Sequence, residues 1–229
     1  MIVVSIIIPV FNEELTIVEL LKKINAQSLD GFELEVVVID DGSTDKTPEL
    51  LAKHNDLFQH LDRLPSNQGK GAAVKAGLKM ASGDYILFQD ADLEYDPNDY
   101  GVMLNPAQTF NSDIVMGSRL NAPKFTRVAY FWHKLGNNLI TLLFNVLYNT
   151  TFTDVYSCYL LYRRTLIDPD SLRTTGWEQH AEILAKARRK AKIIYEVPIS
   201  YHGRTYAEGK KIKAYHVIAV VWTIIRERF

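Results

Sequence analysis

The chain has 229 residues, and its 26 Lys and Arg nearly balance its 27 Asp and Glu, which leaves a net charge of −1. A length of this order favours one domain, and the near-neutral charge removes electrostatic binding to nucleic acid from the default expectations. The lone cysteine, Cys158, excludes an intramolecular disulfide and a cysteine-based zinc site.

The first half of the chain alternates between apolar runs and helical patterns. Strands buried on both faces are predicted at residues 3–9, 34–39, 85–89 and 114–117. Helices are predicted over residues 17–24, from residues 44–48 onward, and over residues 69–81. This alternation predicts a mainly parallel sheet with helices on both faces, and a ligand crevice beyond the carboxyl ends of the strands.

The second half follows a different order. Helices are predicted at residues 131–148, at residues 178–191 and at the C-terminus, and strands at residues 156–162 and 193–198. The first of these helices has an apolar face made of Leu135, Leu139, Leu142, Leu143 and Val146. The uncharged stretches 135–153, which is rich in Asn and Thr, and 214–225 are too polar or too short to be predicted as membrane spans, which need roughly 20 apolar residues.

Polar residues gather where the predicted strands end. The segments concerned are Pro9-Val10-Phe11-Asn12-Glu13-Glu14, Asp40-Asp41-Gly42-Ser43 and Asp90-Ala91-Asp92-Leu93-Glu94. Three acidic clusters at neighbouring strand ends repel one another unless a cation or hydrogen-bond donor groups offset them. Alternation in an extended segment puts Asp90, Asp92 and Glu94 on one side, and such hard oxygen ligands suit Mg²⁺ or Mn²⁺. Asp40 and Asp41 suit hydrogen bonds to a ribose or a base.

A second anion-binding signal lies at Asn67-Gln68-Gly69-Lys70-Gly71, where a loop opens a predicted helix and backbone N–H groups are free to hold phosphate. The segment lacks the spacing of a P-loop, and no dinucleotide-binding glycine motif follows the first strand. A P-loop nucleotidase and a dehydrogenase are therefore disfavoured.

Six motifs occur in a characteristic order: PVFNEE, DDGSTDKT, NQGKGAAVKAG, SGDYILFQDADLE, DIVMGSR and HGRTYAEGKK. In this the chain resembles inverting family 2 glycosyltransferases of the GT-A fold, above all the dolichyl- and polyprenyl-phosphate mannose and glucose synthases. The resemblance implies one α/β domain over residues 1–229 with a Rossmann-like, mainly parallel sheet. Residues 1–118 are then the nucleotide-sugar half, and residues 119–229 are an acceptor-side extension.

The resemblance also implies roles for individual residues. The nucleotide-contacting residues it implies are Pro9, Phe11, Glu13, Ile39, Asp41, Lys70, Asp90, Ala91, Arg204 and Lys210. The metal ligands it implies are Asp90, Asp92 and Glu94, with Glu94 standing where the synthases often have Gln. The catalytic residues it implies are Asp92, Arg119, Asp154 and Arg204, and Arg204 and Lys210 belong to a basic loop that closes on the diphosphate. A metal and cations of this kind stabilise a departing diphosphate.

The expected reaction is metal-dependent transfer of a hexose, with inversion, from a nucleotide-diphosphate sugar of the GDP-mannose or UDP-glucose type to a polyprenyl phosphate. A phosphate monoester is already anionic and needs cations rather than a general base, and candidates are Arg119, Arg127, Arg163 and Arg164. The aromatic and aliphatic residues 125–152 suit an isoprenoid tail or a membrane surface. The expected location is cytoplasmic, with peripheral contact to the membrane.

Three alternatives stay open at this point. Transfer to a saccharide hydroxyl in polysaccharide assembly needs a general base, for which Asp154 and Glu178 are candidates. Glu182 is as readily an ordinary helix carboxylate as a site residue. A non-catalytic nucleotide-sugar-binding module and a nucleotidyltransferase are the alternatives from other classes.

Overall fold

The computed structural model describes residues 1–121, 131–203 and 216–229 of the chain. Its seven strands are β1 (Ile2–Val10), β2 (Phe32–Asp40), β3 (His60–Arg63), β4 (Tyr85–Phe88), β5 (Ile114–Ser118), β6 (Leu160–Arg163) and β7 (Ile194–Pro198). They form one sheet in the order β3-β2-β1-β4-β6-β5-β7. β6 runs antiparallel to β4 and β5, and the other neighbouring pairs are parallel. The predicted mainly parallel α/β sheet is confirmed.

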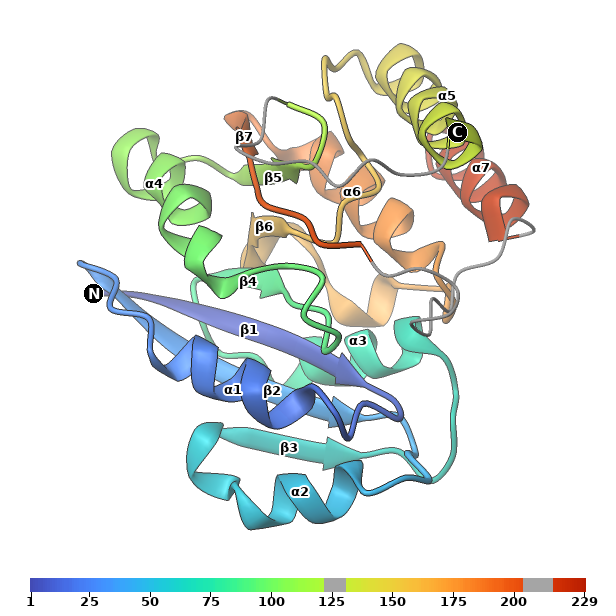
Figure 1. Cartoon of the computed structure of the whole chain (residues 1–229). Coiled ribbons are helices and arrows are strands. Elements are labelled where there is room, and N and C mark those ends of the chain that lie inside the picture. The colour runs from blue at the N-terminus through green and yellow to red at the C-terminus, as the bar shows by residue number, and fades with distance from the viewer. Residues whose placement is uncertain (122–130, 204–215) are drawn as a thin grey trace.

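The helices cover both faces of this sheet (Figure 1). They are α1 (Ile17–Asn25), α2 (Thr47–Lys53), α3 (Lys70–Met80), α4 (Tyr100–Phe110), α5 (Phe131–Tyr148), α6 (Gln179–Lys190) and α7 (His216–Arg226). Helices α1 and α4 lie on one face, and α3 and α6 lie on the other, while α5 and α7 pack together and against α6 beyond the sheet. Within the described residues, 3₁₀ turns lie at Asn55–Leu57, Pro97–Asp99, Arg164–Leu166 and Pro169–Ser171.

The central strands form because their side chains are apolar on both faces. β1 reads IVVSIIIPV, and Ile6, Ile7 and Ile8 are fully buried between the two helical layers. The one polar residue inside β1, Ser5, donates a hydrogen bond to the buried carboxylate of Glu35 on β2. Because β1, β2 and β4 are parallel, their carboxyl ends meet at one edge, which brings the three predicted polar segments together.

Two features of the sheet differ from the sequence-based prediction. The strand β3 was not expected, because its sequence HLDR has no apolar run and lies at the sheet edge. The strand expected over residues 156–162 begins only at Leu160 and runs antiparallel to its neighbours. Helix α4 was also unexpected, and it contains Pro106.

Helix α5 has the predicted bounds, and its sequence forms two apolar faces. One face buries Ile140, Phe144 and Tyr148, with Thr141 among them. The other is the predicted stripe, which lies mostly in solvent, with Leu139 58% and Val146 73% exposed, while Leu143 packs partly buried against the core. No helix in the described part of the chain is both long enough and apolar enough to cross a bilayer.

Candidate active site

A pocket of about 660 Å³ lies at the carboxyl ends of β1, β2 and β4 and extends to α5 and α7. The residues of the sequence motifs that line it are Pro9, Val10, Phe11, Glu13, Asp41, Asn67, Gly69, Lys70, Asp90, Ala91, Asp92, Glu94 and Arg119. Thus most of the predicted site residues in the described part of the chain share one cavity. Ile39 and Asp40 do not line it, because both are buried at the end of β2. Outside it too are Asp154, Arg163, Arg164, Glu178 and Glu182, and Gln68 and Gly71 of the loop motif.

The nucleotide end of the pocket is a set of loops tied to one another. The backbone N–H of Asn12, where φ is +52°, donates to Ser43 Oγ at 2.9 Å, and Asn12 Oδ1 accepts from the N–H of Thr44 at 2.8 Å. The carboxylate of Asp41 accepts from the N–H groups of Gln68 and Gly69 at 2.8 and 2.9 Å. Burial raises the pKa of Asp41 although these two bonds oppose the shift. The loops after β1 and β2 and the start of α3 are thereby held as one surface.

The start of α3 is packed tightly against the loop that precedes α6. Gly69 has a φ of +97°, and a Cβ on Gly71 would lie 2.5 Å from the carbonyl carbon of Thr175. The N–H of Ala72 donates to Thr175 O at 3.2 Å. This contact fixes Lys70 at the floor of the pocket.

The acidic segment after β4 is a turn, so the expectation of an extended segment is wrong. Asp92 Oδ1 accepts from the N–H of Glu94 at 3.1 Å, and Leu93 between them has a φ of +61°. Glu94 accepts from the hydroxyl of Tyr201 at 2.6 Å. The side chain of Asp92 bonds locally to the backbone, which favours a turn over an extended strand end. All three carboxylates still line the pocket.

A lysine lies beside the first of these carboxylates. The ammonium group of Lys70 forms an ion pair with Asp90 and lies 5.0 Å from the centre of the Trp177 ring. Although burial works against ionisation in both groups, Asp90 raises the pKa of Lys70 and Lys70 lowers the pKa of Asp90. A cation therefore already occupies a place next to Asp90.

The residues around Asp90 fit a divalent metal that is held partly by the protein and partly by substrate phosphates. Within the described residues no three Asp, Glu, His or Cys side chains form a cluster that could hold a metal ion by themselves. Mg²⁺ and similar ions are commonly held by one or two carboxylates together with substrate phosphates. The carboxylates of Asp90 and Asp92, which line a cavity that also reaches the start of α3, match that donor set.

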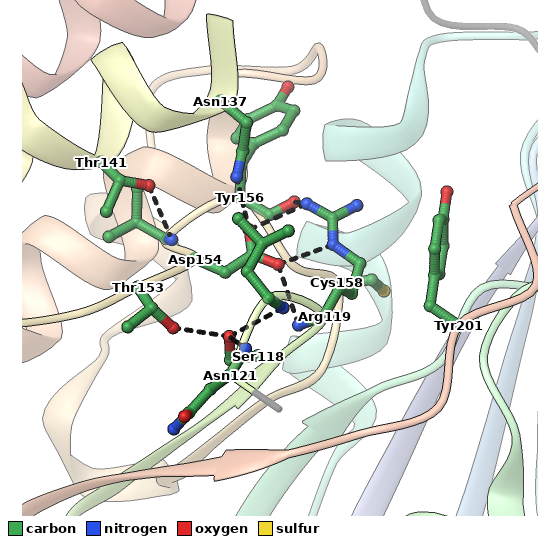
Figure 2. Close-up of polar contacts among 12 residues, drawn as sticks. Ser118, Arg119, Asn121, Asn137, Thr141, Thr153, Asp154, Tyr156, Cys158 and Tyr201 are labelled. Atoms are coloured by element: carbon green, nitrogen blue, oxygen red, sulfur yellow. Dashed lines mark hydrogen bonds and ion pairs between the residues drawn. The ribbon is translucent and has the colours of Figure 1, made fainter. Parts of the chain in front are cut away.

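Arg119 follows β5 and is held by a buried carboxylate (Figure 2). Its Nε and Nη2 donate to Asp154 at 2.7 and 2.9 Å, and its guanidinium lies 5.0 Å from the centre of the Tyr201 ring. Asp154 is fully buried, and Arg119 holds its pKa below the usual range although burial works the other way. A carboxylate with a lowered pKa and no exposure is poorly suited to act as a general base, so this geometry favours a positioning role for Asp154.

Other candidate cations and acids lie away from the pocket. Arg163 pairs with Asp113 at 3.1 Å, Arg164 donates to Gly83 O at 2.7 Å, and neither lines the pocket. The antiparallel direction of β6 explains this, because its carboxyl end lies at the opposite edge of the sheet. Glu182 is buried and accepts from the N–H groups of Arg173 and Thr174, which makes it a clamp on a loop. Arg127, Arg204 and Lys210 lie outside the described residues.

Several lining residues had not been singled out from the sequence. They are Trp132, His133, Gly136, Asn137, Ile140, Tyr156, Trp177, Tyr201 and Val217. A smaller recess of about 90 Å³ adjoins the pocket and is lined by His180, whose pKa burial and Lys70 lower to about 4. These residues come from segments far apart in the chain, and the only sequence signal for them was their position next to a motif, as with Trp177 beside Glu178.

The family model for Glycosyl transferase family 2 matches residues 5–169 of the chain, a span that contains most of the pocket. The chain belongs to glycosyl transferase family 2. This glycosyltransferase is 31% identical over 201 residues to the low-salt glycan biosynthesis hexosyltransferase Agl6 of Haloferax volcanii, with 87% of the chain and 48% of that relative covered. It is 33% identical over 215 residues to undecaprenyl-phosphate 4-deoxy-4-formamido-L-arabinose transferase of Salmonella dublin, with 90% of the chain and 62% of that relative covered.

The glycosyltransferase thus spans about half to two thirds of the length of these two relatives. An uncharacterized protein of Methanocaldococcus jannaschii is closer in length, with 29% identity over 218 residues and 93% of that protein covered. Membership of the family disfavours the nucleotidyltransferase alternative, since family 2 members transfer a sugar.

Solved structures confirm the GT-A fold expected from the motifs. The glucosyl-3-phosphoglycerate synthase of Mycobacterium tuberculosis with Mn²⁺, UDP and phosphoglyceric acid matches the glycosyltransferase with a TM-score of 0.73 at 21% identity, covering 99% of this chain and 78% of that one. TarS of S. aureus with UDP-GlcNAc matches with a TM-score of 0.66 at 19% identity, covering 99% of this chain and 66% of that one.

Proposed function

We propose that this glycosyltransferase transfers a hexose, with inversion and with a divalent metal, from a nucleotide-diphosphate sugar to a polyprenyl phosphate. The observation that carries the proposal is the course of the pocket. It joins the acidic turn after β4 to the guanidinium of Arg119, and then continues along α5. One cavity can therefore hold a donor diphosphate at one end and an anionic acceptor at the other.

At the donor end, Phe11 and Asp41 line the part of the pocket proposed for the nucleoside, and the start of α3 borders the part proposed for the diphosphate. Asp90 and Asp92 would hold Mg²⁺ or Mn²⁺ there, and the bound ion supplies neutralisation of the charge on the leaving group. Lys70 adds a cation on the same side. The Mn²⁺ and UDP bound in the glucosyl-3-phosphoglycerate synthase support the same donor class.

At the acceptor end, Arg119 holds the phosphate monoester against the anomeric carbon of the sugar. A phosphate oxygen forms the new bond to that carbon, the bond from the carbon to the diphosphate oxygen breaks, and the nucleoside diphosphate leaves with the electron pair. The attacking oxygen is already anionic, so no side chain has to remove a proton. The buried, ion-paired state of Asp154 agrees with a reaction that needs no base.

The outer surface of α5 and α7 supports a lipid-linked acceptor. Trp132 is 76% exposed and also lines the pocket, and Trp222 on α7 is 63% exposed. Exposed Lys134 adds positive charge near this apolar surface. Indole rings and cations of this kind are typical of contact with anionic membrane surfaces. The undecaprenyl-phosphate transferase of Salmonella dublin, by its name, acts on such an acceptor.

The test is a donor and acceptor screen with the purified chain and Mn²⁺. UDP-, GDP- and dTDP-sugars are each incubated with undecaprenyl phosphate or with a saccharide acceptor. Mass spectrometry follows the glycosylated product, and released nucleoside diphosphate is quantified. We expect one donor to yield a glycosyl phosphate lipid, whose anomeric configuration by NMR is opposite to that of the donor. Transfer to a saccharide hydroxyl with none to undecaprenyl phosphate would overturn the acceptor assignment.

A further inference from the structure

The carboxylate of Asp154 is surrounded by hydrogen-bond donors from two elements (Figure 2). Its Oδ2 accepts from the backbone N–H of Arg119 at 3.1 Å and from Nε of the same residue at 2.7 Å. Its Oδ1 accepts from Nη2 of Arg119 at 2.9 Å and from Nδ2 of Asn137 at 2.9 Å. A carboxylate offers about four acceptor sites, and here four donors occupy them in the dry interior of the protein.

Asn137 is the donor that comes from α5. Its amide donates to Oδ1, the same oxygen that accepts from Nη2 of Arg119, and so restrains the orientation of the carboxylate. One turn further along the helix, Thr141 Oγ1 accepts from the N–H of Val155 at 3.3 Å. Helix α5 therefore holds both the side chain of Asp154 and the backbone that follows it.

The arrangement determines how Arg119 presents its guanidinium. Nε and Nη2 are used by Asp154, and Nη2 also donates to Tyr156 O at 3.1 Å. Within the described residues Nη1 makes no hydrogen bond, although Arg119 lines the pocket and lies over Tyr201. The planar group thus has two edges locked to the protein and one edge left for a ligand.

We propose that Asn137 is a positioning residue for Arg119: through Asp154 it keeps the Nη1 edge of the guanidinium turned toward an anionic acceptor. The identity of that anion rests on the proposed function. Asn137 lines the same pocket that Arg119 does, and it lies on the helix with the exposed apolar stripe. The position of α5 and the orientation of the Arg119 guanidinium are therefore coupled through the side-chain amide of Asn137.

The test uses Asn137→Ala, with Asn138→Ala as the matched control, because Asn138 is the next residue of α5 and is exposed. Geranyl phosphate serves as a soluble acceptor probe, and the donor dissociation constant is measured on the same samples. We expect Asn137→Ala to raise the KM for geranyl phosphate roughly tenfold, with donor affinity and kcat changed less than about twofold, because one buried hydrogen bond is lost. Asn138→Ala leaves all of these values within about twofold.

Two further readouts separate positioning from direct contact. The Nε–H signal of Arg119 in a ¹⁵N NMR spectrum, assigned by its loss in Arg119→Lys, should shift or broaden in Asn137→Ala and stay in place in Asn138→Ala. In an Arg119→Lys background, Asn137→Ala should produce no further rise in KM, since a lysine cannot make the two-point bond to Asp154.

The outcomes distinguish this proposal from the proposed function. If wild-type protein does not use geranyl phosphate but the Arg119 signal still moves in Asn137→Ala, the acceptor assignment fails and the positioning role stands. An unchanged Arg119 signal in a folded Asn137→Ala protein overturns the positioning role. So does an equal rise in KM in the wild-type and Arg119→Lys backgrounds, because it would mean that Asn137 contacts the acceptor itself.

Discussion

At the scale of single residues, buried carboxylates divide between positioning a site and holding the backbone. Asp154 orients a pocket arginine, whereas Glu182 is buried on α6 and serves the loop before that helix. Glu182 accepts from the N–H groups of Arg173 and Thr174 at 3.0 and 2.9 Å and pairs with Lys186 at 2.6 Å. Because that loop contacts the start of α3, the hydrogen bonds of Glu182 also help to hold the segment that carries Lys70 in the pocket.

Glu182→Gln is expected to lower the free energy of unfolding by about 1–3 kcal/mol at pH 7, because an amide replaces one acceptor oxygen with a donor facing buried N–H groups. These hydrogen bonds lower the pKa of Glu182 in the folded state from 4.5, although burial opposes the shift. Its contribution to stability is thus complete above the unfolded pKa and is lost as the pH falls through the folded pKa.

Urea unfolding of both proteins at pH 7 and at pH values below 4.5 measures this difference. The difference in the free energy of unfolding between wild type and Glu182→Gln should become smaller at the acidic pH values. Glu19→Gln is the control, since Glu19 is exposed and forms only a surface pair with Lys23, so its effect should stay below about 0.5 kcal/mol. A gap that is the same at both pH values would contradict the assignment.

At the scale of elements, α5 contributes one face to the packing of the fold and another to the proposed membrane contact. Its buried face packs Phe144 on Tyr148 with ring centres 4.4 Å apart, and the hydroxyl of Tyr148 donates to Ile224 O of α7 at 2.9 Å. Its other face leaves Leu139 and Leu142 in solvent. An exposed apolar surface of this kind is typical of a binding surface. A membrane is the partner that agrees with the proposed lipid-linked acceptor.

Replacing Leu139 and Leu142 together by Ser is expected to weaken binding to vesicles containing anionic lipid by about tenfold or more. The reason is the loss of apolar area from the face proposed to enter the headgroup region, at about 25 cal/mol per Å². Vesicle sedimentation measures the effect, and the melting temperature should not fall because both side chains are exposed. Leu15→Ser with Val102→Ser removes exposed apolar groups elsewhere and should bind vesicles as wild type does. Equal binding by both double variants would rule out this face.

At the scale of the whole molecule, the pocket is built by segments that are joined only through tertiary contacts. Loops after three parallel strands, the start of α3 and the side chain of Arg119 converge on it. A ligand that bridges these segments binds the folded state and not the unfolded chain. Such a ligand stabilises the entire fold by mass action.

UDP or GDP with Mn²⁺ is therefore expected to raise the melting temperature, and EDTA should remove most of the gain. At a hundredfold excess over the dissociation constant the stabilisation is about 2.7 kcal/mol. Asp92→Asn should lose most of the metal-dependent part, while Asp170→Asn, which alters an exposed ion pair with Lys79, should retain it. Differential scanning fluorimetry with and without EDTA measures this, and an Mn²⁺-dependent gain of normal size in Asp92→Asn would contradict the role of Asp92.

The order of apolar runs was enough to predict the main strands, the bounds of α5 and the place of the crevice. Burial on both faces of a strand and helical periodicity are written in residues that are close in sequence, as in Ile6, Ile7 and Ile8. The motifs at the strand ends could be recognised because each of them is also a run of neighbouring residues. Parallel pairing then carries Phe11, Asp41 and Asp90 to one edge, so their meeting in one pocket follows from the strand order.

Only the tertiary structure decided which side chains are partners within that pocket. Arg119 and Asp154 are 35 residues apart, and Lys70 and Asp90 are 20 apart, so no local pattern records either pair. The edge strand β3 and the reversal of β6 were missed because an exposed short strand and a strand direction leave little mark on hydropathy. Which face of α5 is buried was likewise undetermined, because both faces are apolar and only packing against α6 and α7 distinguishes them.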